Sequence, residues 1–348
     1  MINNYFTERN LKCLKKTREI LSTLPYFCNE FFRGIENQTS ALTRLGYAQD
    51  LKTFFIFLTS EIDEFINIKI KDITLEDLTK LNSTHIEIYL DYLSSYYQNE
   101  KNLSNGEKGK ARKLAVIKSF LKYFYKKDKL PSNIASKVDS PKIHDKEIIR
   151  LEVDEVVKLL NSAENPQTLT KRQQSYNKIT QKRDTALLSL LLGTGIRVSE
   201  CVGLNVEDLD FNINGFRVTR KGGNETVLYF SDEVAKSLIQ YLQERKENKN
   251  IPPEEKALFL SLQNKRITVR AVEKLVKKYS EDSVPLKHIT PHKLRSTYGT
   301  NLYRQTNDIY IVADVLGHKD VNTTRKHYAA ISEDSRRNIA NVVKLRDE

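Results

Sequence analysis

Tryptophan is absent from this chain, and methionine and cysteine are nearly so, since its 348 residues include one methionine and three cysteines. Cys13, Cys28 and Cys201 lie far apart and lack the close spacing of a metal site, and an odd number of thiols cannot all pair within one chain. Hydrophobic runs are short, because the segment 186–192 is far below the roughly 20 residues that cross a bilayer. With no signal peptide in the sequence, these absences predict a cytoplasmic protein with free thiols and no membrane-spanning helix.

Acidic residues are outnumbered as well. Lys and Arg number 57 against 45 Asp and Glu, which gives a net charge of +12 and a pI near 9.3. The cationic residues recur through both halves of a chain long enough for two domains, and a basic globular surface of this kind suits a polyanion such as DNA. Ribosomal and RNA-binding proteins have a similar charge, so the charge indicates only a broad class.

Hydrophobic residues in the first 130 positions recur at helical spacing, which predicts an all-helical N-terminal region. A possible extra helix occupies residues 1–30 and ends at Pro25. A helical domain then spans 31–130 and contains three amphipathic helices. Their apolar positions are Leu42, Leu45, Ala48, Leu51, Phe54, Phe55 and Leu58 in the first, Ile86, Tyr89, Leu90 and Leu93 in the second, and Leu114, Ile117, Phe120, Leu121 and Phe124 in the third.

The third of these helices also carries many positive charges around its apolar face. Such a face suits the DNA backbone, and a solvated lysine-rich surface is the alternative interpretation. The candidates for DNA contact are Lys110, Arg112, Lys113, Lys118 and Lys122, and Lys108, Lys126 and Lys127 flank them.

The helical pattern stops over residues 131–150, where Pro131, Pro141 and several Ser and Asn residues predict an interdomain linker. The second domain then occupies 151–348, with a helix beginning at 153 and a polar, basic segment at 171–182 that we predict to be a loop. Alternating runs on either side of Lys221 predict a β-hairpin, whose tip contains Gly222 and Gly223. The predicted fold is therefore mainly α, with a small antiparallel sheet in the second domain.

Five short phrases in the second domain contain the residues best suited to chemistry on a phosphate. Thr290 and Pro291 predict a helix start, so His292 and Arg295 share a face near that helix's N-terminus, where backbone N–H groups favour phosphate. A glycine at position 317 is typical of a left-handed helix end. The phrases are Gly193-Thr194-Gly195-Ile196-Arg197, Thr219-Arg220-Lys221-Gly222-Gly223, Thr290-Pro291-His292-Lys293-Leu294-Arg295, Leu316-Gly317-His318 and Lys326-His327-Tyr328.

In their order these phrases resemble the active site of the tyrosine recombinase (phage integrase) family, and the layout looks like that of its simpler Xer-type members. The resemblance implies an N-terminal helical DNA-binding domain of SAM-like type at 31–130 and a mostly α catalytic domain at 151–348 that ends in a tail. The catalytic residues that it implies are Arg197, Lys221, His292, Arg295, His318 and Tyr328.

Such a set would need no metal, nucleotide or other cofactor. Guanidinium groups stay charged and present a planar fork to phosphate oxygens, so Arg197 and Arg295 are the candidates for binding the scissile phosphate. Lys221 would protonate the leaving 5′ oxygen as general acid. In the family the position of His318 donates a hydrogen bond to the phosphate, and the tyrosine at position 328 is the nucleophile, which conserves the bond energy in a 3′-phosphotyrosine.

The resemblance further implies site-specific recombination through a Holliday junction, with four protomers on two inverted-repeat DNA sites. The apolar residues of the tail at 331–348 would then dock on a neighbouring protomer, or else on their own domain.

Three other tyrosines lie close to Tyr328 in the sequence. Tyr298, Tyr303 and Tyr310 have core-like helical spacing, which predicts that they are core residues.

Two other functions fit the same residues. One is a type IB topoisomerase, which nicks and reseals without exchanging strands, and the other is a DNA-binding regulator or inactive integrase that does not cut. The target sequence, a second recombinase or accessory factor, and the choice among chromosome partition, plasmid resolution and mobile-element integration stay open.

Overall fold

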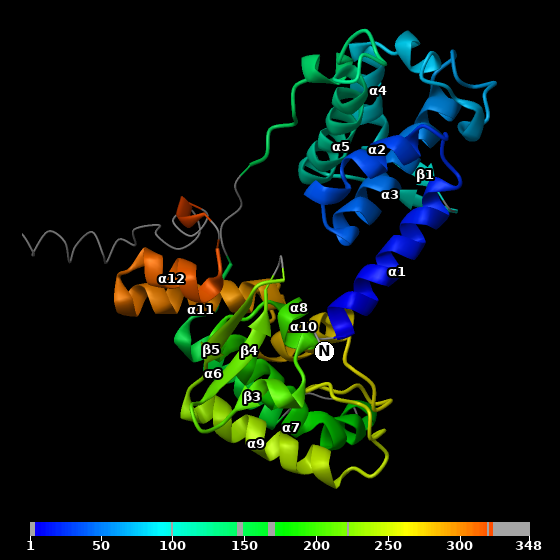
Figure 1. Ribbon diagram of the computed structural model, residues 1–348. Helices are drawn as coiled ribbons and strands as arrows, with labels where there is room; N and C mark the ends of the chain where they lie inside the picture. The colour runs from blue at the N-terminus through cyan, green and yellow to red at the C-terminus, as the bar shows by residue number, and fades with distance from the viewer. Residues whose placement is uncertain are drawn as a thin grey trace, which may run out of the picture. The chain divides into compact units, whose positions relative to one another are not determined.

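The computed structural model describes residues 4–98, 100–144, 149–165, 171–220, 223–318 and 320–322. Two of the predicted catalytic residues, Lys221 and Tyr328, lie outside the described residues, as does the tail at 331–348. The chain divides into two compact units, Met1–Lys146 and Glu147–Glu348 (Figure 1). The division falls within the segment 131–150, but the start of that segment packs on the N-terminal unit, where Ala135 and Val138 are buried in the core.

The N-terminal unit is helical around an aromatic core. Ser40 and Asn82 cap two of its helices by accepting hydrogen bonds from the backbone N–H groups of Thr43 and His85. Fully buried Phe and Tyr side chains from four helices meet edge to face in the interior. Its elements are α1 (Asn4–Leu21), α2 (Cys28–Gly34), α3 (Ala41–Glu61), α4 (Ser83–Tyr92), β1 (Tyr96–Gln98), β2 (Lys101–Leu103) and α5 (Glu107–Tyr125).

The helices predicted for this region are therefore confirmed, with two differences. Leu42 was expected on the buried face of α3, but 54% of it is exposed. The hairpin β1–β2 was not predicted, because strands of three residues are too short to show an alternating pattern.

The C-terminal unit is built around helix α7, which packs against α6, α9 and α11. A three-stranded antiparallel sheet in the order β3-β4-β5 carries the predicted hairpin (Figure 1). Its elements are α6 (Val153–Glu164), α7 (Lys171–Thr194), α8 (Val198–Gly203), β3 (Leu209–Asp210), β4 (Gly215–Thr219), β5 (Glu225–Tyr229), α9 (Asp232–Glu247), α10 (Val269–Ser283), α11 (Pro291–Thr306) and α12 (Ile309–Leu316).

One prediction for this unit is wrong: residues 171–182 form the first half of helix α7 and not a loop. Asn177 and Thr180 are buried there, and the Tyr279 hydroxyl lies 2.7 Å from Asn177 Oδ1 and 2.8 Å from Asp184 Oδ2. Because this buried face is polar, the segment shows no hydrophobic period, and a helix that packs through hydrogen bonds looks like a loop in sequence.

The three cysteines are free, as predicted. All three are also buried, and burial raises the pKa of Cys201 to about 12. Across the described part of the chain, every helix is too short or too polar to cross a membrane.

Candidate active site

The site is organised around the C-terminal end of helix α12. Gly317 has φ +60°, and its backbone N–H donates to Asp314 O at 2.8 Å, while the N–H of His318 donates to Ala313 O at 2.9 Å. These two bonds form the Schellman motif that glycine permits at a helix end. The predicted helix stop is confirmed, and it turns the chain so that His318, which is half-buried, leaves the helix beside its last carbonyls.

Three arginines converge on those carbonyls. The last four carbonyls of an α-helix have no partner within the helix and carry the negative end of its dipole, so they attract cations. Each arginine comes from a different part of the unit: the start of α8, the end of β4 and the first half of α11. The bonds are Arg220 Nη1 to Asp314 O at 3.3 Å, Arg220 Nη2 to Val315 O at 2.8 Å, Arg295 Nη2 to Leu316 O, and Arg197 Nη2 to Gly317 O at 3.1 Å.

The phrase around Arg197 explains how that residue reaches the site. Helix α7 ends at Thr194, and Gly195 follows in the left-handed region with φ +59°. A Cβ on Gly195 would lie 2.5 Å from a ring carbon of Tyr298, so only glycine fits. Arg197 then bonds Glu200 Oε1 at 2.9 Å, and Glu200 is buried. This carboxylate holds the guanidinium in place while about a third of the Arg197 side chain stays exposed, at 32%.

Arg295 reaches the same place from helix α11, which begins as predicted with Thr290 as N-cap and Pro291 in its first turn. Arg295 is 4% exposed, and its Nη1 donates to Gly195 O at 2.6 Å. Arg197 and Arg295, hereafter the arginine pair, therefore lie at one end of α12. His292, three residues before Arg295, is exposed in the first turn of α11.

The structure thus brings together Arg197, Arg295 and His318. Sequence reasoning missed Arg220, although it lies inside one of the quoted phrases, because nothing local shows that its side chain reaches α12, more than 90 residues away. The structure also distinguishes the tyrosines that precede Tyr328 in the sequence. Tyr298 and Tyr303 pack against a small core with Val312 and Leu316, as predicted.

Tyr310 was predicted to be a core residue, but the structure shows it 71% exposed. It lies in the first turn of α12, two residues after Asp308, which caps that helix. Helical spacing alone predicted burial of Tyr310, but a residue in the first turn of a short helix can fit that spacing and still be exposed.

Gly317 provides a test of this geometry. A Cβ at this position would lie 1.5 Å from Arg220 Nη1, and the left-handed backbone adds about 1–2 kcal/mol of strain for any other residue. We expect Gly317→Ala to lower the unfolding temperature and to displace the guanidinium of Arg220. Gly46 lies inside helix α3, where the nearest atom to an added Cβ is Arg112 Nη1 at 3.8 Å, so Gly46→Ala is expected to raise stability by up to about 1 kcal/mol. Thermal unfolding of both variants tests whether the unfolding temperature falls in Gly317→Ala and rises in Gly46→Ala.

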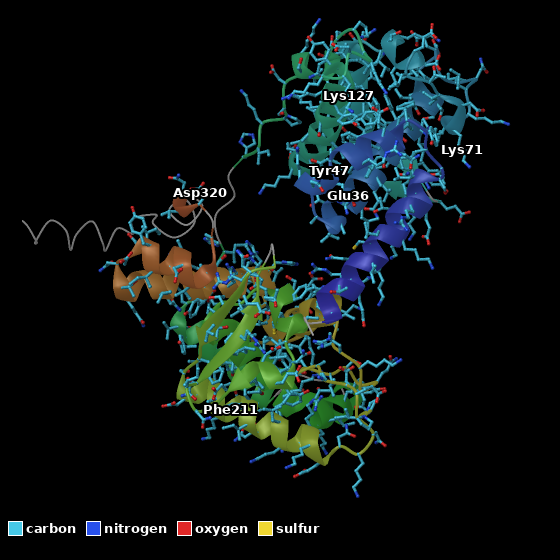
Figure 2. All side chains as sticks on the ribbon, viewed as in Figure 1. Glu36, Tyr47, Lys71, Lys127, Phe211 and Asp320 are labelled. Atoms are coloured by element: carbon cyan, nitrogen blue, oxygen red, sulfur yellow. The ribbon has the colours of Figure 1, made fainter. Side chains whose placement is uncertain are left out.

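The predicted DNA-binding face on α5 is only partly exposed. Arg112 and Lys122 are exposed, and Lys110 and Lys118 are half-buried, with Lys110 Nζ donating to Ser94 Oγ at 2.7 Å. Lys127, labelled in Figure 2, lies just beyond the helix and within 5.2 Å of the Tyr123 ring centroid.

Lys113 was predicted to contact DNA, but its side chain is buried and does not lie on the exposed face of α5. Its Nζ donates to Asp50 Oδ1 at 2.9 Å, and Asp50 on α3 also receives two bonds from Arg112. Asp50 is 1% exposed, so this charge network compensates a buried carboxylate. Lys113 therefore stabilises the packing of α3 on α5 and does not offer its charge to a phosphate at the surface.

Among the described residues, no group of His, Cys, Asp and Glu side chains could hold a metal ion. The chemistry available from the described site is that of fixed cations. Guanidinium groups held by carbonyls and by a buried carboxylate are suited to an incoming phosphodiester, because their positions are set before the anion arrives.

The fold and the site define a protein suited to binding a phosphodiester, and comparison with known proteins identifies its family. Residues 150–334 match the phage integrase family. A tyrosine recombinase XerC of Caldanaerobacter subterraneus subsp. tengcongensis is 34% identical over 289 residues, covering 80% of this chain and 75% of that protein. A tyrosine recombinase XerS of Streptococcus thermophilus is 29% identical over 354 residues, covering 94% and 98%. The chain therefore belongs to the phage integrase family, the tyrosine recombinases.

Solved structures are similar to this chain in fold. XerH site-specific recombinase bound to a palindromic difH substrate has a TM-score of 0.64 at 18% identity, covering 88% of this chain and 81% of that one. The Tn1549 transposon integrase in complex with circular intermediate DNA has a TM-score of 0.63 at 19% identity, covering 91% and 99%. These likenesses confirm the mainly α fold with small antiparallel sheets.

Proposed function

We propose that this chain is a site-specific DNA recombinase that cleaves and rejoins strands through a 3′-phosphotyrosine on Tyr328. The observation that carries the proposal is the convergence of the arginine pair on one helix end, beside His318, in a chain of the tyrosine recombinase family. A phosphodiester placed there would meet two guanidinium groups and one imidazole.

The reaction follows from these groups. The Tyr328 hydroxyl loses its proton to solvent as its oxygen attacks the phosphorus, and the bond to the 5′ oxygen breaks as Lys221 supplies a proton to that oxygen. The arginine pair stabilises the negative charge that grows on the non-bridging oxygens. In the second step the 5′ hydroxyl of another strand attacks the phosphotyrosine and gives its proton to Lys221. The bond between phosphorus and the Tyr328 oxygen breaks, and that oxygen regains a proton from solvent. Two such rounds exchange four strands by way of a Holliday junction.

The relatives supply the partner. XerH was solved bound to its difH substrate and the Tn1549 integrase in complex with circular intermediate DNA. We extend DNA binding to this chain, with the exposed Arg112 and Lys122 and the half-buried Lys110 and Lys118 facing the DNA backbone. One protomer carries one Tyr328 and four strands exchange, so we infer a tetramer on two inverted-repeat sites, working in the cytoplasm.

A nicked DNA substrate tests the proposal directly. The inverted-repeat site is first selected by binding from a random DNA library, and a copy with a nick near the cleavage point then traps the covalent intermediate. We expect a protein–DNA adduct on a denaturing gel. Binding without an adduct would identify a regulator, and an adduct without strand exchange between two sites would identify a topoisomerase.

Chelation gives a second prediction. Because side-chain cations do the work that a metal does in other phosphoryl-transfer sites, adduct formation is expected to be unchanged, within about twofold, in excess EDTA and without nucleotide. The same gel measures it, with the EDTA-treated protein compared at equal ionic strength because DNA binding depends on salt. Loss of the adduct in chelator, and its recovery with a divalent ion, would contradict the mechanism.

A further inference from the structure

Arg220 connects the hairpin of Lys221 to the rest of the site. It follows the last residue of strand β4, and its side chain donates to Val315 O at 2.8 Å and to Asp314 O at 3.3 Å on helix α12. Its backbone closes the hairpin turn as well: the N–H of Arg220 donates to Asn224 O at 2.8 Å, and Arg220 O accepts from Gly223 N–H at 3.0 Å. Arg220 is therefore bonded both to Gly223 and Asn224, just before strand β5, and to the end of helix α12.

The surroundings of Arg220 show that this contact is built into the fold. A Cβ on Gly317 would occupy the space of the Arg220 guanidinium, so the glycine that ends α12 also makes room for this side chain. Burial lowers the pKa of Arg220, Arg197 lowers it further, and Glu200 and Asp314 oppose both effects. Arg220 thus lies within electrostatic range of Arg197 and of Glu200, the carboxylate that holds Arg197.

We infer that Arg220 is a positioning residue, which sets where Lys221 stands relative to the arginine pair. The inference rests on the proposed function, in which Lys221 is the general acid. A general acid must reach the leaving oxygen at hydrogen-bond distance, and an error of about 1 Å in placement costs on the order of a hundredfold in rate. Lys221 follows Arg220 directly in the sequence, so the bonds of Arg220 are the described contacts nearest to it along the chain.

The leaving group of the substrate separates positioning from binding. A thiolate leaves without a proton, so a nicked substrate with sulfur in place of the bridging 5′ oxygen needs no general acid. We expect Arg220→Ala to slow single-turnover cleavage of the oxygen substrate by roughly ten- to a hundredfold, and cleavage of the sulfur substrate by no more than about threefold. Lys221→Ala should show the same pattern, and the double variant should be no slower on oxygen than Lys221→Ala alone.

The matched control is Arg217→Ala on the same strand. Arg217 is an exposed residue that pairs with Asp208 at 3.7 Å, and its loss removes the same charge without touching α12, so both substrates should be cleaved at the wild-type rate. Arg220→Lys retains the charge but cannot bond both carbonyls with the same fork, and it should give a smaller defect that sulfur also relieves. This variant, with circular dichroism as a check on folding, keeps the test valid if the alanine variant does not fold.

If Arg220→Ala and Arg220→Lys each slowed cleavage of the sulfur substrate as much as cleavage of the oxygen substrate, the inference would be overturned. Arg220 would then bind the phosphate or have a purely structural role. The inference would also be overturned if the double variant were slower on the oxygen substrate than Lys221→Ala by the full factor that Arg220→Ala alone costs. Failure of the proposed function looks different, because wild-type protein would then form no adduct with either substrate. If wild type reacts but sulfur does not rescue Lys221→Ala, Lys221 is not the acid, and the role given to Arg220 falls with it.

Discussion

Replacing Tyr328 with Phe is expected to abolish covalent attachment to DNA while DNA affinity stays near that of the wild type. The change removes one oxygen, the nucleophile, and loss of a catalytic nucleophile costs on the order of a millionfold in rate. Binding should persist because it depends on many Lys and Arg contacts with the phosphate backbone. The measurement pairs the nicked-substrate adduct on a denaturing gel with a filter-binding or gel-shift titration of the same DNA.

Tyr310→Phe is the matched control. Tyr310 is 71% exposed and lies on the helix whose end forms the site, so it is the described tyrosine best able to compete as nucleophile. Its Phe variant should form the adduct at the wild-type rate. If Tyr328→Phe kept the adduct and Tyr310→Phe lost it, the nucleophile would be Tyr310 and the family pattern would have misled the assignment.

Local signals predicted local structure well. Thr290 and Pro291 begin α11, Gly317 ends α12, and the glycine-containing turn after Thr219 joins two paired strands, because capping and turn chemistry act within a few residues. The order of the catalytic phrases likewise led to the correct family, since those phrases are short enough to be read without any knowledge of packing.

The errors arose where the decisive partner is distant in sequence. Lys113 shares a helix with surface lysines, and only the fold shows that Asp50, 63 residues earlier, buries it. The buried polar face of α7 depends on Tyr279, about 100 residues later. Arg220 was overlooked for the same reason. Charge and hydrogen bonding between remote elements leave no periodic trace in a single sequence, whereas hydrophobic faces do.

The carbonyls of α12 add a physical reason for the activity of such a site. Arginines that only faced solvent would have to reorganise before binding a phosphate, and that reorganisation raises the barrier. Here the helix end, the carboxylate of Glu200 and Gly195 O hold the arginine pair beforehand. Because the same bonds make the pair part of the fold, we expect its loss to lower stability and cleavage rate together.

Arg295→Ala is therefore expected to have two separable effects. Loss of a fixed charge next to a developing oxyanion should slow cleavage by about a hundred- to a thousandfold. Gly195 O and Leu316 O also lose a donor, and each buried carbonyl left without one costs about 1–3 kcal/mol of unfolding free energy. Arg197→Ala should slow cleavage to a similar degree and leave the buried carboxylate of Glu200 without its cation.

The two effects are distinguished by measuring rates well below the unfolding midpoint and by a control on the same helix. Arg304 on α11 is exposed and pairs with Glu152 at 3.0 Å, so Arg304→Ala should change stability by no more than about 1 kcal/mol and leave cleavage unchanged. Arg295→Lys retains the charge but loses the planar fork that serves both carbonyls, and it should still cleave at least roughly tenfold more slowly than wild type. If a folded Arg295→Ala variant cleaved DNA at the wild-type rate, Arg295 would have no role in stabilising the scissile phosphate. It would then be a purely structural link between α11 and α12.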